Sequence, residues 1–250
     1  MNKTIYRVMS IIMALTLTFR GYYEAQASST TVSLQAATSY YVSMTGNDAN
    51  SGTLASPFKT ITKAISAAQT GYSIYVRAGT YPAFTVSKND LIISGYPGER
   101  PIISDGLGIQ LSGSNITLSD FEVTAMTNNY SAGIVSFGAN NIIKANIVHD
   151  NVYANMSGII VSGGSHNQVT DNIVYNNNKF GIGIYGAAAA NNTVSRNTAY
   201  NHTLSTGDSD GIHCSGNSTQ NTFNENITYG NSDDGLDTWD CTNNLITNNI

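Results

Sequence analysis

The strongest constraint on the fold is a short motif that recurs along the second half of the chain. Five segments share the pattern Asn-x-apolar-x-x-Asn, and their first residues are 26, 25, 29 and 23 positions apart. The segments are residues 141–146, 167–172, 192–197, 221–226 and 244–249. In four of them an aromatic or imidazole side chain follows at the same offset, at His149, Tyr175, Tyr200 and Tyr229. A repeat of this length indicates a solenoid in which each repeat forms one coil.

A second, glycine-containing series interleaves with the first. Its members are residues 157–163, 180–186, 210–216 and 234–240. Alignment on their glycines gives two columns: Ile159, Ile182, Ile212 and Leu236 in one, and Val161, Ile184, Cys214 and Thr238 in the other. Alternation along a strand sends both columns to the interior. Two short strands per coil, joined by turns, predict an all-β protein with a parallel β-helix.

Asparagine is unusually frequent, with thirty residues in the chain and twenty-three of them from Asn140 onward. Equivalent turn residues of successive coils lie about 4.8 Å apart, so their amides can pass hydrogen bonds along the stack. We therefore expect the asparagines of one column to form a structural ladder. That column contains Asn146, Asn172, Asn197, Asn226 and Asn249.

A single short helix is expected before the coils. Within residues 57–69 the apolar side chains recur with helical spacing, and Ser56-Pro57 is a suitable helix start. Short β segments follow at 73–77, 91–93 and 101–104. We expect the helix to cover the open end of the first coil and protect its strand edges.

The N-terminus has the features of an export signal. Lys3 and Arg7 precede an apolar run over residues 8–19, and Ala25-Gln26-Ala27 supplies a cleavage pattern. We expect a signal peptide at 1–27, a Ser/Thr/Ala-rich lead-in at 28–39 and a β-helix domain at 40–250, secreted and without a membrane anchor. Because the last coil stops after its second Asn, we expect the sequence to be a fragment truncated within the β-helix.

The charge balance bears on possible partners. A formal charge of −5 and an isoelectric point near 5.2 provide no general attraction to nucleic acid or to anionic membranes.

Two cysteines, Cys214 and Cys241, are too few for a disulfide framework, and the sequence leaves their pairing open. We expect a monomer.

Acidic residues gather near the end of the chain, where six of the twelve aspartates lie between positions 208 and 240. Asp210 and Asp234 occupy the same position of neighbouring coils, Asp233 precedes Asp234, and Asp237 points outward beside His213 of the coil below. Four carboxylates on one outer face would repel one another unless a cation is bound. Aspartate oxygens suit a hard ion, and calcium tolerates irregular geometry. The alternatives are a solvated acidic turn and a calcium ion with a purely structural role.

Other outward residues surround this cluster, with Asp208 at its edge. Tyr185, Ser215 and Trp239 form a column on the same strand face. We predict that Trp239, the only tryptophan, is exposed, either as a platform for a sugar ring or as an ordinary surface aromatic. His213 could contact a substrate or hydrogen-bond an aspartate, and we favour the aspartate.

The chain resembles the family 9 polysaccharide lyases, secreted calcium-dependent pectate lyases with a right-handed parallel β-helix. Residues 40–52, 56–64 and 76–81 are similar to the N-terminal cap and first coil found in many β-helix proteins. The more specific match is Ser209-Asp-Gly-Ile212 followed by Asn231-Ser-Asp-Asp-Gly-Leu-Asp237, which resembles the calcium-binding coils of the family.

The resemblance implies a function and a set of site residues. Asp210, Asp233, Asp234 and Asp237 would bind Ca²⁺, and the substrate would be polygalacturonate, an acidic plant cell-wall polysaccharide, cleaved by β-elimination. The general base of the family is a lysine on a later coil, so we expect it beyond Ile250. Trp239, His213 and Tyr185 are the candidate substrate contacts.

Other functions remain open at this point. An inverting glycoside hydrolase of the polygalacturonase kind also places aspartates on adjacent coils but uses them without metal. The chain lacks the Gly-His-Gly of those enzymes and the Asp-Pro-His motif of C5 epimerases with this fold. A non-catalytic β-helix that binds polysaccharide or serves as a surface protein is the third alternative.

Overall fold

The structure is a computed structural model that describes residues 38–126, 132–203 and 208–250. The expected signal peptide and most of the lead-in lie outside the described residues. The described residues form one compact unit. No helix within the described part of the chain is long and apolar enough to cross a membrane.

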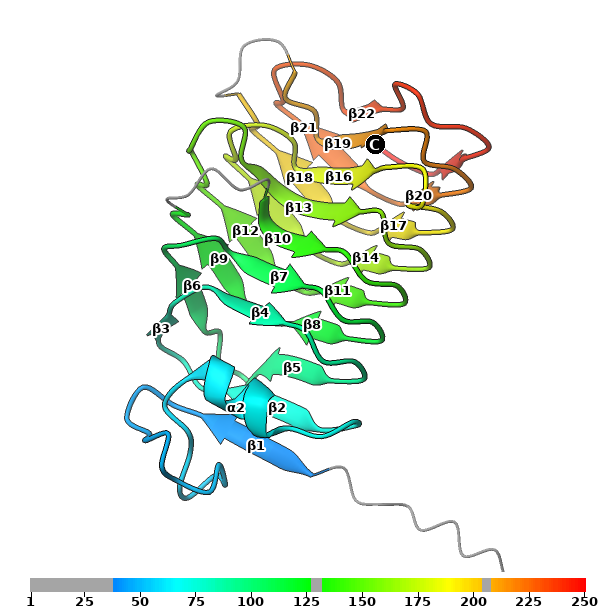
Figure 1. Ribbon diagram of the computed structural model, residues 1–250. Helices are drawn as coiled ribbons and strands as arrows, with labels where there is room; N and C mark the ends of the chain where they lie inside the picture. The colour runs from blue at the N-terminus through cyan, green and yellow to red at the C-terminus, as the bar shows by residue number, and fades with distance from the viewer. Residues whose placement is uncertain (1–37, 127–131, 204–207) are drawn as a thin grey trace, which may run out of the picture. The chain divides into compact units, whose positions relative to one another are not determined.

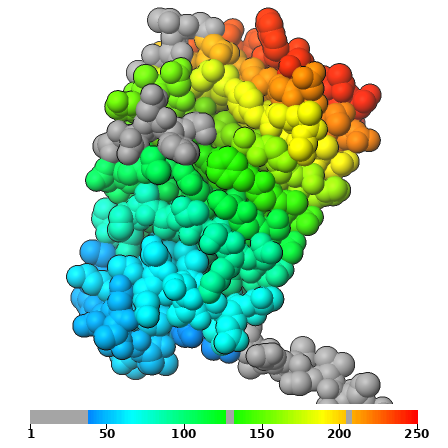
Figure 2. All heavy atoms as spheres, in the orientation of Figure 1, coloured from blue at the N-terminus to red at the C-terminus, as the bar shows by residue number. Residues whose placement is uncertain are grey.

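The fold is a right-handed parallel β-helix built from three parallel sheets (Figure 1). Sheet A contains β1 (Ser39–Val42), β2 (Ser73–Val76), β5 (Ile92–Gly95), β8 (Thr117–Ser119), β11 (Ile142–Lys144), β14 (Gln168–Thr170), β17 (Thr193–Ser195), β20 (Thr222–Asn224) and β23 (Leu245–Thr247). Sheet B contains β4 (Phe84–Val86), β7 (Ile109–Leu111), β10 (Ala132–Ser136), β13 (Ser157–Ser162), β16 (Ile182–Tyr185), β19 (Ile212–Ser215) and β22 (Leu236–Asp237). Sheet C contains β3 (Thr80–Tyr81), β6 (Ile102–Ser104), β9 (Glu122–Thr124), β12 (Ile147–His149), β15 (Ile173–Tyr175), β18 (Thr198–Tyr200) and β21 (Ile227–Tyr229). The space-filling view shows the same order of coils at the surface, from the N-terminal cap to the last coils (Figure 2).

The sequence predicted two strands per coil, and the structure has three. The Asn-x-apolar-x-x-Asn motif contains a three-residue strand of sheet A and the bend that follows it. In one coil β11 ends at Lys144, Ala145 has a left-handed φ of 55°, and β12 begins at Ile147. A strand this short, separated from the next by two residues, produces no alternation pattern of its own.

The interior columns are confirmed by the strand register. Ile159 pairs with Ile182, which pairs with Ile212, which pairs with Leu236. The first three of these side chains are fully buried, and Leu236 on the last coil is half-buried. Stacking of identical positions therefore builds one continuous apolar core along the solenoid.

The asparagine ladders are also confirmed. In the predicted column and in a parallel column, the backbone N–H of each asparagine donates to Oδ1 of the asparagine one coil later, at 2.8–3.0 Å. The parallel column contains Asn141, Asn167, Asn192, Asn221 and Asn244. These buried groups satisfy one another, and a lost partner would cost about 1–3 kcal/mol.

A third ladder was not predicted. It runs through Asn151, Asn177, His202 and Asn231, where His202 takes the place of an asparagine.

The outward aromatic column on sheet C forms a separate stack of four rings. The ring centroids are 4.7 Å apart between His149 and Tyr175, 5.1 Å between Tyr175 and Tyr200, and 4.8 Å between Tyr200 and Tyr229. The recurring aromatic position therefore reflects stacking between coils.

The helix begins later than the sequence predicted. α2 spans Ile61–Ala67, and Thr60 is its N-cap, with Oγ1 accepting from the backbone N–H of Lys63 at 3.1 Å. The start at Ser56-Pro57 is wrong because Phe58 pairs with β1 through its backbone and keeps this segment extended. Ile61, Ala64 and Ile65 are buried, and the helix lies beside β1, β2 and β4 at the N-terminal end, which confirms its capping position (Figure 1).

Candidate functional site

Two neighbouring coils of sheet B carry the acidic cluster. Asp210 precedes β19 and Asp234 precedes β22, and each is followed by a glycine. A Cβ added at Gly211 would lie 2.7 Å from the carbonyl oxygen of Gly235, so the coils pack too closely here for any other residue. This close packing sets the two aspartates one strand spacing apart, about 4.8 Å.

Asp210 is a buried carboxylate with fixed partners. Its side chain is 1% exposed. Oδ1 accepts from the backbone N–H of Asp234 at 3.0 Å, and Oδ2 accepts from Nδ1 of His213 at 2.8 Å. A buried charge needs such bonds, and here they also fix the orientation of the carboxylate.

His213 joins Asp210 to Asp237. Its Nδ1 is 3.3 Å from Oδ2 of Asp237, which the strand register places directly opposite. The ring stacks on Phe180 with centroids 4.1 Å apart. The hydrogen bond to an aspartate, favoured for His213 from the sequence, is present, and the side chain is only 8% exposed.

Three of the four predicted calcium ligands converge. Carboxylate oxygens of Asp210, Asp233 and Asp234 lie within 4.8 Å of one another. Asp237 is not part of this group and lies beside His213 instead. Asp208, which the sequence placed at the edge, lies within the same distance of Asp210 and His213.

The electrostatics of the cluster oppose full ionisation. Desolvation and the carboxylates of Asp210, Asp234 and Asp208 raise the pKa of Asp233 above its ordinary value. Desolvation also raises the pKa of Asp237, with contributions from Asp210 and Asp234, while His213 acts in the opposite direction. The only salt bridge from a lysine or arginine to these aspartates, within the described residues, joins Lys179 Nζ to Asp208 Oδ2 at 3.2 Å.

The donor set fits a hard divalent cation. It offers carboxylate oxygens from a turn and the start of a strand, and the exposed Asp233 and Asp234 leave room for water or another ligand. Calcium accepts six to eight oxygen ligands in such irregular arrangements. A bound cation would also relieve the repulsion that raises the pKa values of Asp233 and Asp237.

The predicted outward column is present in part. Tyr185 pairs in register with Ser215, and Tyr185 is half-buried against Phe180 and His213, with ring centroids 5.9 and 5.6 Å away. Burial raises the pKa of Tyr185. Ser215 is itself buried, whereas Trp239 lies beyond β22 and is 80% exposed, which confirms its predicted exposure.

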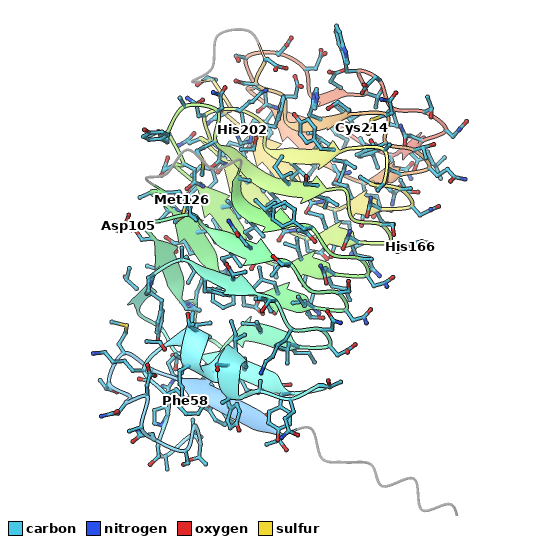
Figure 3. The ribbon with its side chains drawn as sticks, in the orientation of Figure 1. Phe58, Asp105, Met126, His166, His202 and Cys214 are labelled. Atoms are coloured by element: carbon cyan, nitrogen blue, oxygen red, sulfur yellow. A yellow bond between two sulfur atoms is a disulfide. The ribbon has the colours of Figure 1, made fainter. Side chains whose placement is uncertain are left out.

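A disulfide joins Cys214 to Cys241 behind the cluster. Cys214 is the fully buried, inward neighbour of His213 on β19, and Cys241 follows Asp240 on the next coil. The bond therefore ties together the two coils that carry the aspartates. Figure 3 shows Cys214 toward the C-terminal end of the solenoid. Two features of the sequence could have indicated this pairing: Cys214 lies in an inward column, and Cys241 lies one coil later.

Two contacts near the cluster were not predicted. Phe180 occupies the glycine-aligned position taken by Asp210 and Asp234 on later coils, and there it forms the base on which His213 stacks. Lys179 reaches Asp208 across one coil. The alignment could have indicated the first contact, whereas the second depends on the conformation of a long side chain.

Comparison with known proteins places this geometry in context. The family described as "Pel9A-like, right handed beta helix region" matches residues 40–250. No curated protein is significantly similar in sequence.

Several solved structures share the fold. A rhamnogalacturonan lyase has a TM-score of 0.57 at 22% identity, covering 85% of this chain and 56% of its own. The pectate lyase Pel9A has a TM-score of 0.57 at 15% identity, covering 77% and 63% respectively. XylC in complex with xylose has a TM-score of 0.58 at 12% identity, covering 84% and 67%. The chain thus spans less than two thirds of the two lyases, and identities of this size establish the shared fold.

Proposed function

The chain belongs to the Pel9A-like family of right-handed β-helix regions, and from this premise we propose that it is part of a calcium-dependent polysaccharide lyase of family 9. The proposed substrate is polygalacturonate, and the proposed reaction is β-elimination. The observation that carries the proposal is the convergence of the Asp210, Asp233 and Asp234 carboxylates within 4.8 Å on the outer face of sheet B.

The proposed metal ligands are Asp210, Asp233, Asp234 and Asp237. These residues would hold calcium, which when bound would supply positive charge that makes the C5 proton of a neighbouring uronate more acidic. Asp210 is held rigid by Asp234 and His213, so it can orient the site without rearrangement.

The elimination itself needs a base that the cluster does not supply. The base removes the C5 proton, the electron pair forms the C4–C5 double bond, and the C4–O bond breaks to release the leaving sugar, which takes up a proton. We propose a lysine on a coil after Ile250 for this role.

The proposed residues of the substrate-facing surface are Trp239, Tyr185 and His213. Trp239 is exposed enough for a sugar ring to stack on it.

The cellular context is proposed on sequence grounds. Residues 1–27 would direct secretion and be removed, which suits an enzyme whose substrate lies outside the cell. The disulfide between Cys214 and Cys241 supports an oxidising compartment. We propose that the protein acts as a monomer.

The test is an assay of the full-length protein on polygalacturonate. We expect unsaturated, ultraviolet-absorbing oligogalacturonides in the presence of calcium and none after chelation. Activity that survives a chelator would contradict the calcium mechanism. New reducing ends without a double bond would indicate a glycoside hydrolase, epimerised uronates without cleavage would indicate an epimerase, and binding alone would indicate a non-catalytic protein.

A further inference from the structure

A pocket lies on the outer face of sheet B, on the N-terminal side of the acidic cluster. It has a volume of about 300 Å³ and is formed by β13, β16 and the segments that precede them. Its apolar surface comes from Ile160, Phe180 and Tyr185, and its polar groups come from Asn155, Ser157 and Ser162. Lys179 completes the lining, and we call this feature the Lys179 pocket.

The lining suits a sugar ring. Ile160 and Phe180 are almost fully buried and supply a rigid apolar base, while the more exposed Asn155 and Ser162 offer hydrogen bonds. A pyranose ring has apolar C–H faces and a polar rim of hydroxyl groups. Small-molecule sites combine apolar walls with a few placed polar groups in this way.

Lys179 determines the charge of the ligand that fits. It is the only lysine or arginine among the residues that line the pocket. Its Nζ lies 3.2 Å from Asp208 Oδ2 and 4.5 Å from the centroid of the Phe180 ring. An ordinary lysine is a cation at neutral pH, so its side chain is suited to bind a carboxylate.

The pocket and the acidic cluster share their walls. Phe180 and Tyr185 line the pocket, and both contact the ring of His213, which in turn bonds Asp210. The strands beneath the pocket and the cluster are neighbours in sheet B, about 4.8 Å apart per coil. A polysaccharide lying along the coils over the cluster would therefore place an adjacent residue over the pocket.

We propose that the Lys179 pocket binds the carboxylate of a second uronate residue of the same polysaccharide chain. In this arrangement the cluster holds one uronate and Lys179 recognises its neighbour on the N-terminal side. The proposal rests on the proposed function for its substrate class, an acidic polysaccharide. It requires neither calcium nor the elimination reaction, so it can be tested separately.

Affinity electrophoresis tests the pocket without turnover. The full chain is run in the cold through gels that contain polygalacturonate, with calcium in one gel and chelator in a parallel gel. We expect polygalacturonate to retard the wild type in at least one gel, and Lys179→Met to weaken that affinity about tenfold, the loss typical of a charge-assisted hydrogen bond. Lys179→Arg should retain most of the retardation. The matched control is Lys144→Met, which removes an exposed lysine from sheet A and should migrate like the wild type.

Three results would overturn the proposal. The first is a wild type that is not retarded in either gel. The second is a Lys179→Met variant that is retarded as much as the wild type. The third is a loss of retardation by Lys179→Met that is equally large in gels of fully methyl-esterified, neutral polygalacturonate. Melting curves identify any variant that has lost its fold, and Lys179→Gln then replaces Lys179→Met. If retardation depends on Lys179 but no unsaturated products form, the pocket proposal is supported and the lyase function is refuted. If unsaturated products form but Lys179→Met binds like the wild type, the lyase function is supported and the pocket proposal is refuted.

Discussion

The backbone N–H of Asp234 donates to Oδ1 of Asp210 at 3.0 Å. In the two long asparagine ladders an asparagine oxygen accepts the bond between coils. Here a carboxylate accepts it, and the bond runs in the opposite direction along the stack. The acidic cluster therefore contains a bond between coils whose acceptor is a carboxylate and not an amide, which distinguishes it from the ladders.

Asp210→Asn should separate these two roles. The amide keeps an oxygen for the N–H of Asp234 but removes the charge that a cation needs. We expect calcium affinity to fall on the order of a hundredfold, with the fold and the calcium-free melting temperature little changed. Isothermal titration with calcium and melting curves with and without the ion measure the two effects. Asp171→Asn, in the surface pair with Arg196, is the control and should bind calcium normally. Equal calcium affinity in Asp210→Asn and the wild type would contradict the proposed metal site.

Asp237→Ala should distinguish a lyase from a non-catalytic binder. The substitution removes the carboxylate opposite His213 but leaves the bond between His213 and Asp210. A lyase should lose most of its turnover on polygalacturonate, whereas a binder should keep its ligand and lose at most some thermal stability. Parallel assays of unsaturated products and of polysaccharide binding give the answer. Full turnover in the variant would exclude Asp237 from the site.

Features that depend on residues one coil apart could be predicted from the sequence. The interior columns, such as Ile182 beside Ile212, and the asparagine ladders follow directly from the repeat spacing. The third ladder could not be recognised because His202 interrupts its run of asparagines. The third strand of each coil was hidden because its three residues follow a two-residue bend.

The site was predicted less completely than the fold. Alternation fixes the face on which a residue lies, and it placed the aspartates on one outer surface. Asp237 lies beside His213, as the sequence predicted. Alternation does not fix how far a side chain reaches, so the separation of Asp237 from the carboxylates of Asp210, Asp233 and Asp234 was not foreseen. The salt bridge between Lys179 and Asp208 depends on side-chain conformation for the same reason.

Removal of the disulfide should destabilise the coils that carry the cluster. The bond joins residues separated by 27 positions, and closing a loop of that size stabilises a protein by about 3.5 kcal/mol, mainly by restricting the unfolded chain. We expect a reducing agent to lower the melting temperature of the wild type but not that of the double variant Cys214→Ala/Cys241→Ala. A wild type that melts at the same temperature with and without reductant would show that the bond is absent or without effect.

His202 should make the stability of the protein sensitive to acid. Its Nδ1 accepts from the backbone N–H of Asn177 at 3.2 Å, and the backbone N–H of His202 donates to Asn231 Oδ1 at 3.2 Å, within the third ladder (Figure 3). Burial lowers the pKa of His202 to about 4. The ladder therefore holds neutral imidazole, and its contribution is complete above the unfolded pKa of 6.5 and is lost as the pH falls toward 4. The loss of folding free energy should be on the order of 3 kcal/mol.

His202→Asn should remove this acid sensitivity, because asparagine continues the ladder and does not titrate. Urea unfolding at a series of pH values between 7 and 4 should show a smaller loss of stability in the variant than in the wild type. The control is His166→Asn, since His166 is exposed and its left-handed φ of 57° suits asparagine. That variant should retain the slope of the wild type. Equal slopes for His202→Asn and the wild type would mean that the imidazole is not held neutral by burial in the ladder.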